Sequence, residues 1–330
     1  MANNKIAVLI PAYNVKYLDD VMQGLRFQTY QDFDVYISDD SPNDEITNRL
    51  IYLENNGLLS NLNVTVEAGP KQKIGRLNYW RLDRKYSSEY EFIHFHSDDD
   101  YIYPTFYEDH LEAHKHGDFS ASLSKRWISN ELNTPVGKPI NVAFGKLNQA
   151  YTPLTLEAIA KSSLPYSVNW LGELTNCLIK GTGRSLFILP PYDGNNLNYF
   201  GLLDIGTFLD LAQSKNLIYI HSYISNWRRH AEQSTNSIGS HGIRIAVLCW
   251  LAYSIKAHND GLIDENDLLS SIERRKRVLK SRMETDVFFE DPLNLISEDV
   301  ELKIIKKKFT DWWINFLSIS RSRAEIEFNN

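Results

Sequence analysis

Cysteine is scarce in this sequence, and so is any apolar run long enough for a secretory signal or a membrane span. Cys177 and Cys249 are the only cysteines among 330 residues, and neither has a Cys or His at the spacing of metal ligands. We predict two reduced thiols in the core, which excludes a disulfide scaffold. The first apolar run, Ile6 to Ile10, is too early and too short for either membrane element. We therefore expect a cytoplasmic protein.

An excess of positive charge is also missing. The chain has 35 Lys and Arg against 42 Asp and Glu, a net charge of -7, whereas nucleic-acid-binding proteins present broad basic surfaces to phosphates. No nucleic-acid partner is expected. With 43% hydrophobic residues, the chain can fill the core of one large α/β domain and a smaller addition.

Short apolar runs alternate with helical periodicity in the first 100 residues. The continuous run Ile6 to Ile10 is typical of a strand buried on both faces of a parallel sheet. Leu18, Val21, Met22 and Leu25 then recur at helical spacing. Further strands are predicted at 34–38, around 64–66 and at 92–95, with helices at 45–55 and about 75–86. This pattern predicts an α/β fold with a doubly wound, mostly parallel, Rossmann-like sheet.

The alternation weakens after about residue 151. A stretch rich in Gly, Pro and Asn from Gly181 to Asn198 predicts a long loop around a substrate cleft. Beyond Gly242 the pattern is helical to the end. We predict one domain over 1–240 and a C-terminal helical region over 241–330.

Asp98-Asp99-Asp100 directly follows the predicted strand at 92–95 and is the strongest chemical feature. Three adjacent carboxylates repel and need a cation or protons to coexist. Mg²⁺ and Mn²⁺ prefer oxygen ligands and are often bound by one or two carboxylates together with a diphosphate. The triplet therefore predicts a metal-diphosphate site, and the alternative is a solvated acidic turn.

Several segments occur in the order that is typical of one family. They are Ile10-Pro11-Ala12-Tyr13-Asn14, Gln28-Thr29-Tyr30, Asp39-Asp40-Ser41-Pro42-Asn43-Asp44, Gly75-Arg76-Leu77-Asn78 and His96-Ser97-Asp98-Asp99-Asp100. Together they resemble motifs of family 2 glycosyltransferases of the GT-A fold, over roughly residues 5 to 235. The resemblance implies nucleotide-sugar binding by 1–105 and acceptor binding by 106–240.

The resemblance assigns a donor pocket for a UDP- or dTDP-sugar. Pro11, Ala12 and Tyr13 would line the base pocket, Asp40 would hydrogen-bond the base, and Arg76 would approach the pyrophosphate or the base. Pro42 stands where the family often has Ser.

A metal ion, Mg²⁺ or Mn²⁺, is implied as well. Asp98 would contact the ribose or the metal, and Asp99 the metal. Pro104 allows two registers of this segment against the family motif. The paired carboxylates are therefore either Asp98 and Asp99 or Asp99 and Asp100. A usual first aspartate is replaced by His96 or Ser97, which leaves the ribose contacts open.

The segment YISNWRRHAEQS, at 223–234, is similar to the Y-R-x-H-x-x-S tail of the family. His230 would complete the metal shell or bind a phosphate oxygen. Arg228 or Arg229 would hold the leaving diphosphate, and Arg229 is the residue we assign. The alternative is a surface loop with incidental charges.

An inverting transfer needs a base for the proton of the acceptor hydroxyl. Leu203-Asp204-Ile205-Gly206-Thr207-Phe208-Leu209 resembles the E-D-x-x-x-x-L segment of the family, although Leu203 replaces its Glu. Asp204 is the predicted base, and Asp210 competes with it on the same predicted helix. A helix-capping role is the structural alternative for Asp204.

Acceptor contacts are less defined. Asn169-Trp170-Leu171-Gly172 and Tyr192-Asp193-Gly194-Asn195 have the polar and aromatic composition of sugar-binding segments, with ordinary packing as the alternative for Trp170. The tail combines Lys306-Lys307-Lys308 with Trp312, Trp313, Phe316 and Leu317, as interfacial helices do. This pattern indicates either peripheral contact with the inner face of a membrane, suited to a lipid-linked acceptor, or packing against the catalytic domain or a second subunit of a homo-oligomer.

The preferred hypothesis is an inverting glycosyltransferase that acts on a glycan or lipid-linked acceptor, in polysaccharide biosynthesis. A nucleotidyltransferase should carry a Gly-rich, basic loop after its first strand, whereas this chain has Pro11-Ala12-Tyr13-Asn14 there. A catalytically inactive nucleotide- or sugar-binding module is the alternative from another class, favoured by the departures at Leu203 and His96.

Overall fold

The computed structural model describes residues 5–72, 75–139, 149–181, 201–231, 233, 241–298 and 300–329, without the side chains of residue 241 and of those beyond 318. The chain divides into two compact units, and both draw on segments distant in sequence. The first comprises Met1–Leu154, Trp170–Phe187 and Leu211–Ala231, and the second comprises Thr155–Asn169, Ile188–Asp210 and Glu232–Asn330. Each unit is described by itself.

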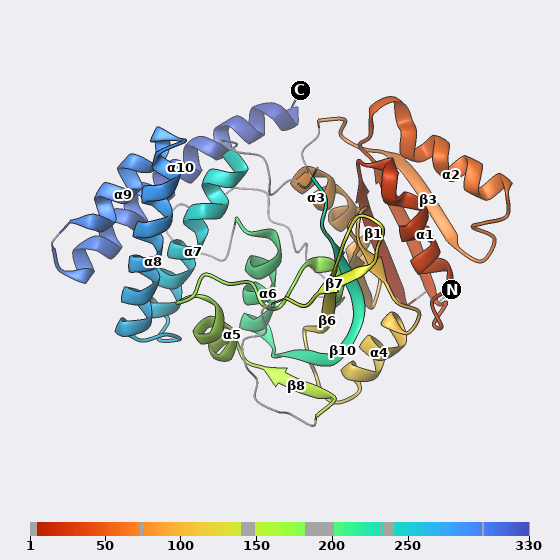
Figure 1. The fold of residues 1–330 in the computed structure, drawn as a ribbon, viewed down its shortest axis with the longest axis horizontal. Helices are drawn as coiled ribbons and strands as arrows, with labels where there is room; N and C mark the ends of the chain where they lie inside the picture. Colours follow the sequence, from red (N-terminus) through yellow and green to blue (C-terminus); the bar gives the residue numbers. More distant parts are fainter. Residues whose placement is uncertain are drawn as a thin grey trace. The chain divides into compact units, whose positions relative to one another are not determined.

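The first unit is built on one mixed sheet of order β3-β2-β1-β4-β9-β6-β10-β5, with β7 paired to β6 and β8 to β10 (Figure 1). Its strands β3, β2, β1 and β4 are parallel, as predicted. Antiparallel pairing begins where β9 meets β4 and β6. The strands are β1 Ile6–Ala12, β2 Phe33–Asp39, β3 Asn63–Ala68, β4 Phe92–Phe95, β5 Tyr101–Ile102, β6 Ala121–Ser129, β7 Pro135–Gly137, β8 Tyr151–Leu154, β9 Cys177–Lys180 and β10 Leu217–Arg228.

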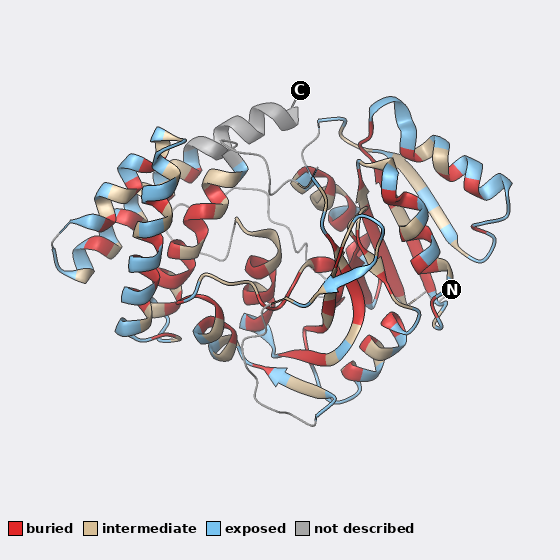
Figure 2. Ribbon diagram, viewed as in Figure 1, coloured by how far each residue is buried: buried red, intermediate tan, exposed pale blue. Residues whose placement is uncertain are grey.

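The centre of the sheet is apolar on both faces. Every residue from Ile6 to Ile10 is fully buried, which confirms the prediction drawn from that run, and Figure 2 shows the buried residues concentrated along the strands. One face is covered by α1, α2 and α4, whose apolar side chains form a single core with Ile6, Val8 and Ile10. The helix α3 also packs on β1, and its side chains are not part of that core. Helices therefore lie on both faces of the sheet.

The helices of the first unit connect the strands at their ends. They are α1 Leu18–Arg26, α2 Glu45–Asn55, α3 Gly75–Tyr86 and α4 Phe106–His114, with the 3₁₀ turns η1 Val15–Tyr17, η2 Pro42–Asp44, η3 Ser87–Glu89 and η4 Leu174–Asn176. Because β1, β2 and β3 are parallel, the segments that leave their carboxyl ends (η1, η2 and the N-terminus of α3) share one edge of the sheet. This edge carries most of the motif residues.

The second unit is helical, which confirms the pattern read beyond Gly242. Within it α7 packs on α8, α8 on α9, and α10 on both α9 and α7. Its elements are α5 Leu156–Ser163, most of α6 Leu203–Ser214, α7 His241–Asn259, α8 Glu265–Met283, η6 Val287–Phe289, α9 Glu290–Ser297 and α10 Leu302–Asn329. Cys249 on α7 and Cys177 in the first unit are both buried, and they form no disulfide.

The aromatic and basic tail packs within this helical unit. Trp313 and Leu317 are 2% exposed, and Phe316 stacks on Trp312. The three lysines have partners of their own: Lys306 with Asn259, Lys307 with Asp311 and Lys308 with Glu298. These contacts favour the packing interpretation of the tail. Among the described residues, no helix has the length and apolarity to cross a membrane.

Candidate functional site

The end of β1 is joined to the acidic loop after β4. Asp98 Oδ2 accepts hydrogen bonds from the backbone N–H groups of Tyr13, at 2.6 Å, and Asn14, at 2.8 Å. Burial, together with the neighbouring charge of Asp99, raises the pKa of Asp98 to about 6, although these N–H donors act in the opposite direction. Asp98 therefore fixes the backbone that follows Pro11 and Ala12, the residues predicted to line a base pocket.

The two aspartates at the end of β2 have different surroundings. Asp39 is fully buried and accepts from the N–H and hydroxyl groups of both Ser41 and Thr47, at 2.5–2.9 Å. Burial alone would raise the pKa of Asp39, but these hydrogen bonds outweigh it and hold the pKa below its usual value. Asp39 has a structural role in shaping the turn.

Asp40 is 5% exposed, and its Oδ1 has no hydrogen-bond partner among the described residues. Its backbone N–H donates to the Ala12 carbonyl at 2.8 Å, which places it beside the end of β1. A buried carboxylate oxygen without a donor is costly unless a ligand supplies one. An N–H group of a nucleobase is such a donor.

A close backbone contact holds this turn in place. Gly69, just after β3, donates its N–H to the Asp39 carbonyl at 2.7 Å, and a Cβ at Gly69 would lie 2.7 Å from the same oxygen. Lys71 donates to the Ser41 carbonyl at 2.9 Å and pairs with Asp44. Neither Gly69 nor Lys71 was predicted from the sequence to belong to the site. The cluster Gly69-Pro70-Lys71 after a predicted strand was the available signal.

The N-terminus of α3 reaches the same edge. Arg76 lies in its first turn and is half-buried, and Asn78 donates to the Ser38 carbonyl at 3.1 Å. The Oδ1 of Asn78 and the Oγ of Ser38 are buried without a hydrogen-bond partner among the described residues. A helix N-terminus attracts anions, so this position suits the predicted contact of Arg76 with a pyrophosphate.

The three adjacent carboxylates make separate contacts. Asp98 binds the backbone after β1, as described. Asp99 Oδ2 lies 2.9 Å from His230 Nε2. Asp100 is 2% exposed and accepts from the Arg228 backbone N–H at 3.0 Å. Burial, with the charges of Asp99 and Glu173, raises its pKa well above the usual value.

The two arginines of the 223–234 segment are also separated. Arg228 is 1% exposed, whereas Arg229 is exposed, with its guanidinium carbon 5.2 Å from the centre of the Trp227 ring. Arg229 is thus the one that is accessible to a ligand. His94 is a core histidine whose ring nitrogens contact the Tyr107 hydroxyl and the Thr175 carbonyl.

The chemistry of Asp99 and His230 fits a divalent metal. The carboxylate oxygen and the imidazole nitrogen converge at 2.9 Å, and two protein ligands suffice when a diphosphate and water complete the shell. No group of three or more His, Cys, Asp and Glu side chains with metal-binding geometry occurs in the described part of the chain. A metal here would therefore depend on the phosphates of a donor.

The predicted base lies in the second unit. Asp204 is in the first turn of α6, which begins at Leu203, so it is inside the helix and not at its N-cap. Asp210 follows six residues later, which on an α-helix places its side chain roughly 120° around the axis from that of Asp204. The two candidates therefore occupy different faces of α6.

Of the two segments predicted to contact an acceptor, the one around Trp170 is described and the other is not. Trp170 is 2% exposed and packs against Tyr219, with ring centres 5.5 Å apart, as ordinary packing predicts. The loop from Gly181 to Asn198 lies outside the described residues beyond Gly181, and so does the segment 192–195.

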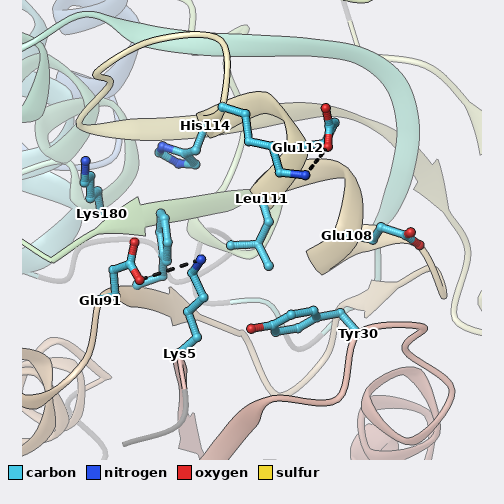
Figure 3. Close-up of a pocket in the computed structure, with 10 residues that line it drawn as sticks. Lys5, Tyr30, Glu91, Glu108, Leu111, Glu112, His114 and Lys180 are labelled. Atoms are coloured by element: carbon cyan, nitrogen blue, oxygen red, sulfur yellow. Dashed lines mark hydrogen bonds and ion pairs between the residues drawn. The ribbon is translucent and has the colours of Figure 1, made fainter. Parts of the chain in front are cut away.

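A separate cavity of about 380 Å³ lies at the opposite, amino edge of the sheet, where Lys5 and Glu91 precede β1 and β4 (Figure 3). It is lined by charges that pair locally, Lys5 with Glu91 at 3.7 Å and Lys115 with Glu112 at 2.6 Å. Of the motif residues Tyr30 lines it, but none of the residues assigned to the donor, the metal or the base does, so the cavity is not part of the candidate site.

The carboxyl edge of this mixed α/β sheet brings together a buried carboxylate oxygen without a donor among the described residues and a carboxylate–imidazole pair. This arrangement fits a nucleotide-dependent transferase of the GT-A type. The sequence profile described as Glycosyl transferase family 2 matches residues 7–174, and the chain belongs to this family of glycosyltransferases. No curated protein matches the sequence in a direct search.

Solved structures with the same fold include those of TarS from S. aureus. The fragment 1-349 has a TM-score of 0.54 at 17% identity, over 88% of this chain and 78% of the fragment. Its complex with UDP-GlcNAc has a TM-score of 0.51 at 14% identity, over 96% and 92%. The longer TarS structure has a TM-score of 0.55 at 15% identity, and 97% of this chain covers 54% of it. At these identities the likeness shows the fold alone.

Proposed function

We propose that this protein is an inverting glycosyltransferase that transfers a sugar from a UDP- or dTDP-sugar to a hydroxyl of a glycan or lipid-linked acceptor. The observation that carries the proposal is the combination, on one sheet edge, of the unpaired Asp40 Oδ1 with the Asp99–His230 pair. The first suits a nucleobase and the second suits the metal of a diphosphate. A TarS complex with UDP-GlcNAc shows that this fold accommodates such a donor.

The donor would lie along the carboxyl ends of β1, β2 and β4. Asp40 would accept an N–H of the base, beside the Ala12 carbonyl that fixes its backbone. Asp98 would keep the Tyr13 and Asn14 backbone in the shape of the pocket. Arg76 and the exposed Arg229 would bind the diphosphate, because guanidinium groups donate two hydrogen bonds to phosphate oxygens.

Asp99 and His230 would hold Mg²⁺ or Mn²⁺ together with the diphosphate oxygens. When bound, the metal neutralises negative charge that builds up on the departing diphosphate. The protein contributes two ligand atoms already within 2.9 Å of each other, so little rearrangement is needed on binding. Asp98 would contact the ribose or the metal, and Asp100 would support the loop from its buried side.

Asp204 would act as the general base. A carboxylate that accepts the proton of the acceptor hydroxyl lets that oxygen attack the anomeric carbon on the face opposite the diphosphate. Its place in the first turn of α6, half-buried, suits a group that must remain ionised, because the helix N-terminus favours negative charge.

The experiment is donor hydrolysis by the purified full chain across a panel of UDP- and dTDP-sugars, with Mn²⁺ or with EDTA. We expect metal-dependent release of the nucleoside diphosphate. The variant Asp204→Asn should lower kcat by at least about 100-fold, with the nucleotide affinity unchanged. Asp210→Asn is the matched control on the same helix and should retain activity.

Two outcomes would count against the proposal. If Asp210→Asn abolished turnover and Asp204→Asn did not, the base would be Asp210. If the protein bound UDP or dTDP but released no diphosphate from any donor or with any acceptor, it would be a binding module, not an enzyme of this reaction.

A further inference from the structure

The guanidinium group of Arg228 is enclosed by protein groups. Its Nε donates to the Asp99 carbonyl at 2.6 Å, its Nη1 to the Glu131 carbonyl at 2.7 Å, and its Nη2 to Asp20 Oδ2 at 2.7 Å. The side chain is 1% exposed. Three of the five N–H donors of the guanidinium are thus directed to protein acceptors, and burial of the side chain keeps the group from reaching a diphosphate.

These contacts fix the acidic loop on both sides of the Asp99 side chain. The Nε bond holds the carbonyl of Asp99, and the backbone N–H of Arg228 holds the carboxylate of Asp100 at 3.0 Å. The direction of the Asp99 carboxylate is therefore set by two hydrogen bonds from one residue.

The ring of Tyr17 lies between Arg228 and His230, the other residue of the proposed metal pair. The Arg228 guanidinium carbon lies 4.5 Å from the centre of the Tyr17 ring. The same ring contacts the His230 imidazole, with ring centres 4.9 Å apart. Tyr17 is 4% exposed, so it is held rigidly between the guanidinium and the imidazole.

We infer that Arg228 is a positioning residue for the metal pair, with Asp20 as its counter-ion, and that it does not bind the diphosphate. The inference rests on the proposed metal-dependent transfer and deepens it. Residues that orient metal ligands typically contribute about 10- to 100-fold to metal affinity. Lysine cannot replace this role, because a single ammonium cannot reach the carbonyls of Asp99 and Glu131 and the carboxylate of Asp20 in one plane.

The experiment measures Mn²⁺ affinity by isothermal titration of the full chain in the presence of UDP, and UDP affinity separately in EDTA. We expect Arg228→Lys to weaken Mn²⁺ binding about 10- to 100-fold while the metal-free UDP affinity changes by less than about twofold. Asp20→Asn should weaken Mn²⁺ binding in the same direction, by a smaller factor, since it keeps a hydrogen-bond acceptor and removes only the charge.

The neighbouring pair Arg49–Asp19 provides matched controls. Arg49 Nε donates to Asp19 at 2.8 Å, Asp19 is adjacent to Asp20 on α1, and both side chains are more than a third exposed. Arg49→Lys and Asp19→Asn should leave Mn²⁺ binding at the wild-type value, since within the described residues the pair makes no hydrogen bond or ion pair with Asp99, Asp100, Tyr17 or His230.

Unchanged Mn²⁺ affinity in Asp20→Asn and in folded Arg228→Lys would overturn the inference. So would a loss of metal-free UDP affinity in Arg228→Lys, because that is the signature of a direct phosphate ligand. If Arg228→Lys failed to fold in a thermal scan, Asp20→Asn would decide the question, because Asp20 is 41% exposed. A wild-type protein without Mn²⁺ affinity would overturn the metal site itself, and with it this role.

Discussion

The two edges of the sheet in the first unit both carry charged side chains, yet they differ in how their polar groups are satisfied. At the amino edge, the lysines that line the cavity pair with nearby carboxylates: Lys5 with Glu91, Lys115 with Glu112, and Lys180 with Asp118. At the carboxyl edge, three buried acceptors have no hydrogen-bond partner among the described residues: Ser38 Oγ, Asp40 Oδ1 and Asn78 Oδ1. Charged side chains often line surface cavities, whereas buried acceptors without donors are rare in folded proteins. Among the described residues that line the amino-edge cavity, His114 Nε2 is the one buried atom that likewise lacks a partner. Buried polar atoms without partners are therefore concentrated at the carboxyl edge, which favours that edge as the ligand site.

The largest effect should come from Asp99 at the carboxyl edge. Asp99→Asn removes the charge that pairs with His230 and would bind the metal, so kcat/KM for a donor should fall at least about 100-fold. Glu91→Gln at the amino edge breaks a long, exposed ion pair and should leave kcat/KM unchanged. The measurement is nucleoside diphosphate release with saturating Mn²⁺. Equal losses in the two variants would remove the distinction between the edges.

A smaller effect is expected at the end of β2, where two adjacent aspartates differ in their hydrogen bonds. Asp39 accepts from Ser41 and Thr47, whereas Asp40 Oδ1 has no partner among the described residues. Asp40→Ala should weaken UDP binding by roughly tenfold, the usual contribution of one charge-assisted hydrogen bond. The free energy of unfolding of this variant should not fall, because the substitution removes a buried oxygen that has no hydrogen-bond partner among the described residues. Asp39→Ala should instead lower the free energy of unfolding by about 1–3 kcal/mol, because Ser41 and Thr47 lose their acceptor.

Calorimetric titration with UDP and denaturation by urea would separate these two roles. A stability loss at Asp40 as large as that at Asp39 would show that Asp40 is a structural residue as well. The assignment of the base pocket would then lose its main support.

The smallest effect concerns stability alone and lies at the amino edge. Burial, assisted by the charges of Lys180 and Lys5, lowers the pKa of His114 to about 4. Because the unfolded chain then binds a proton at a higher pH than the folded one, His114 lowers the free energy of unfolding as the pH falls from about 6.5 to about 4. His114→Gln should reduce this loss by about 1–3 kcal/mol and leave transfer activity unchanged. Urea denaturation of both proteins at pH 7 and pH 4.5 would test it, and an equal loss in both would refute it.

Much of the fold followed from local pattern. The unbroken apolar run at Ile6–Ile10 could only be a strand covered on both faces, and helical spacing predicted α2 and α3 at their observed bounds. The strands β6, β9 and β10 were not predicted, because their pairing is set by partners 50 or more residues away. Burial of β10 on both faces also removed the alternation that reveals half-exposed strands.

The candidate site was predictable as a set of segments but not as a set of contacts. The sequence placed Asp40 and Asp98–Asp100 at one edge, because carboxyl ends of parallel strands meet there. It could not tell which of three adjacent carboxylates points inward, since a tight turn sends neighbouring side chains in different directions. Nor could it show that Arg228 is enclosed, because Asp20 and Glu131 are distant in the chain.

A crystal structure of the protein with UDP and Mn²⁺, with the metal located by its anomalous signal, would test the proposed site directly. We expect manganese bound by Asp99, His230 and the diphosphate, with the base donating to Asp40. Nucleotide in the amino-edge cavity beside Lys5 and Glu91, or manganese away from Asp99, would contradict it.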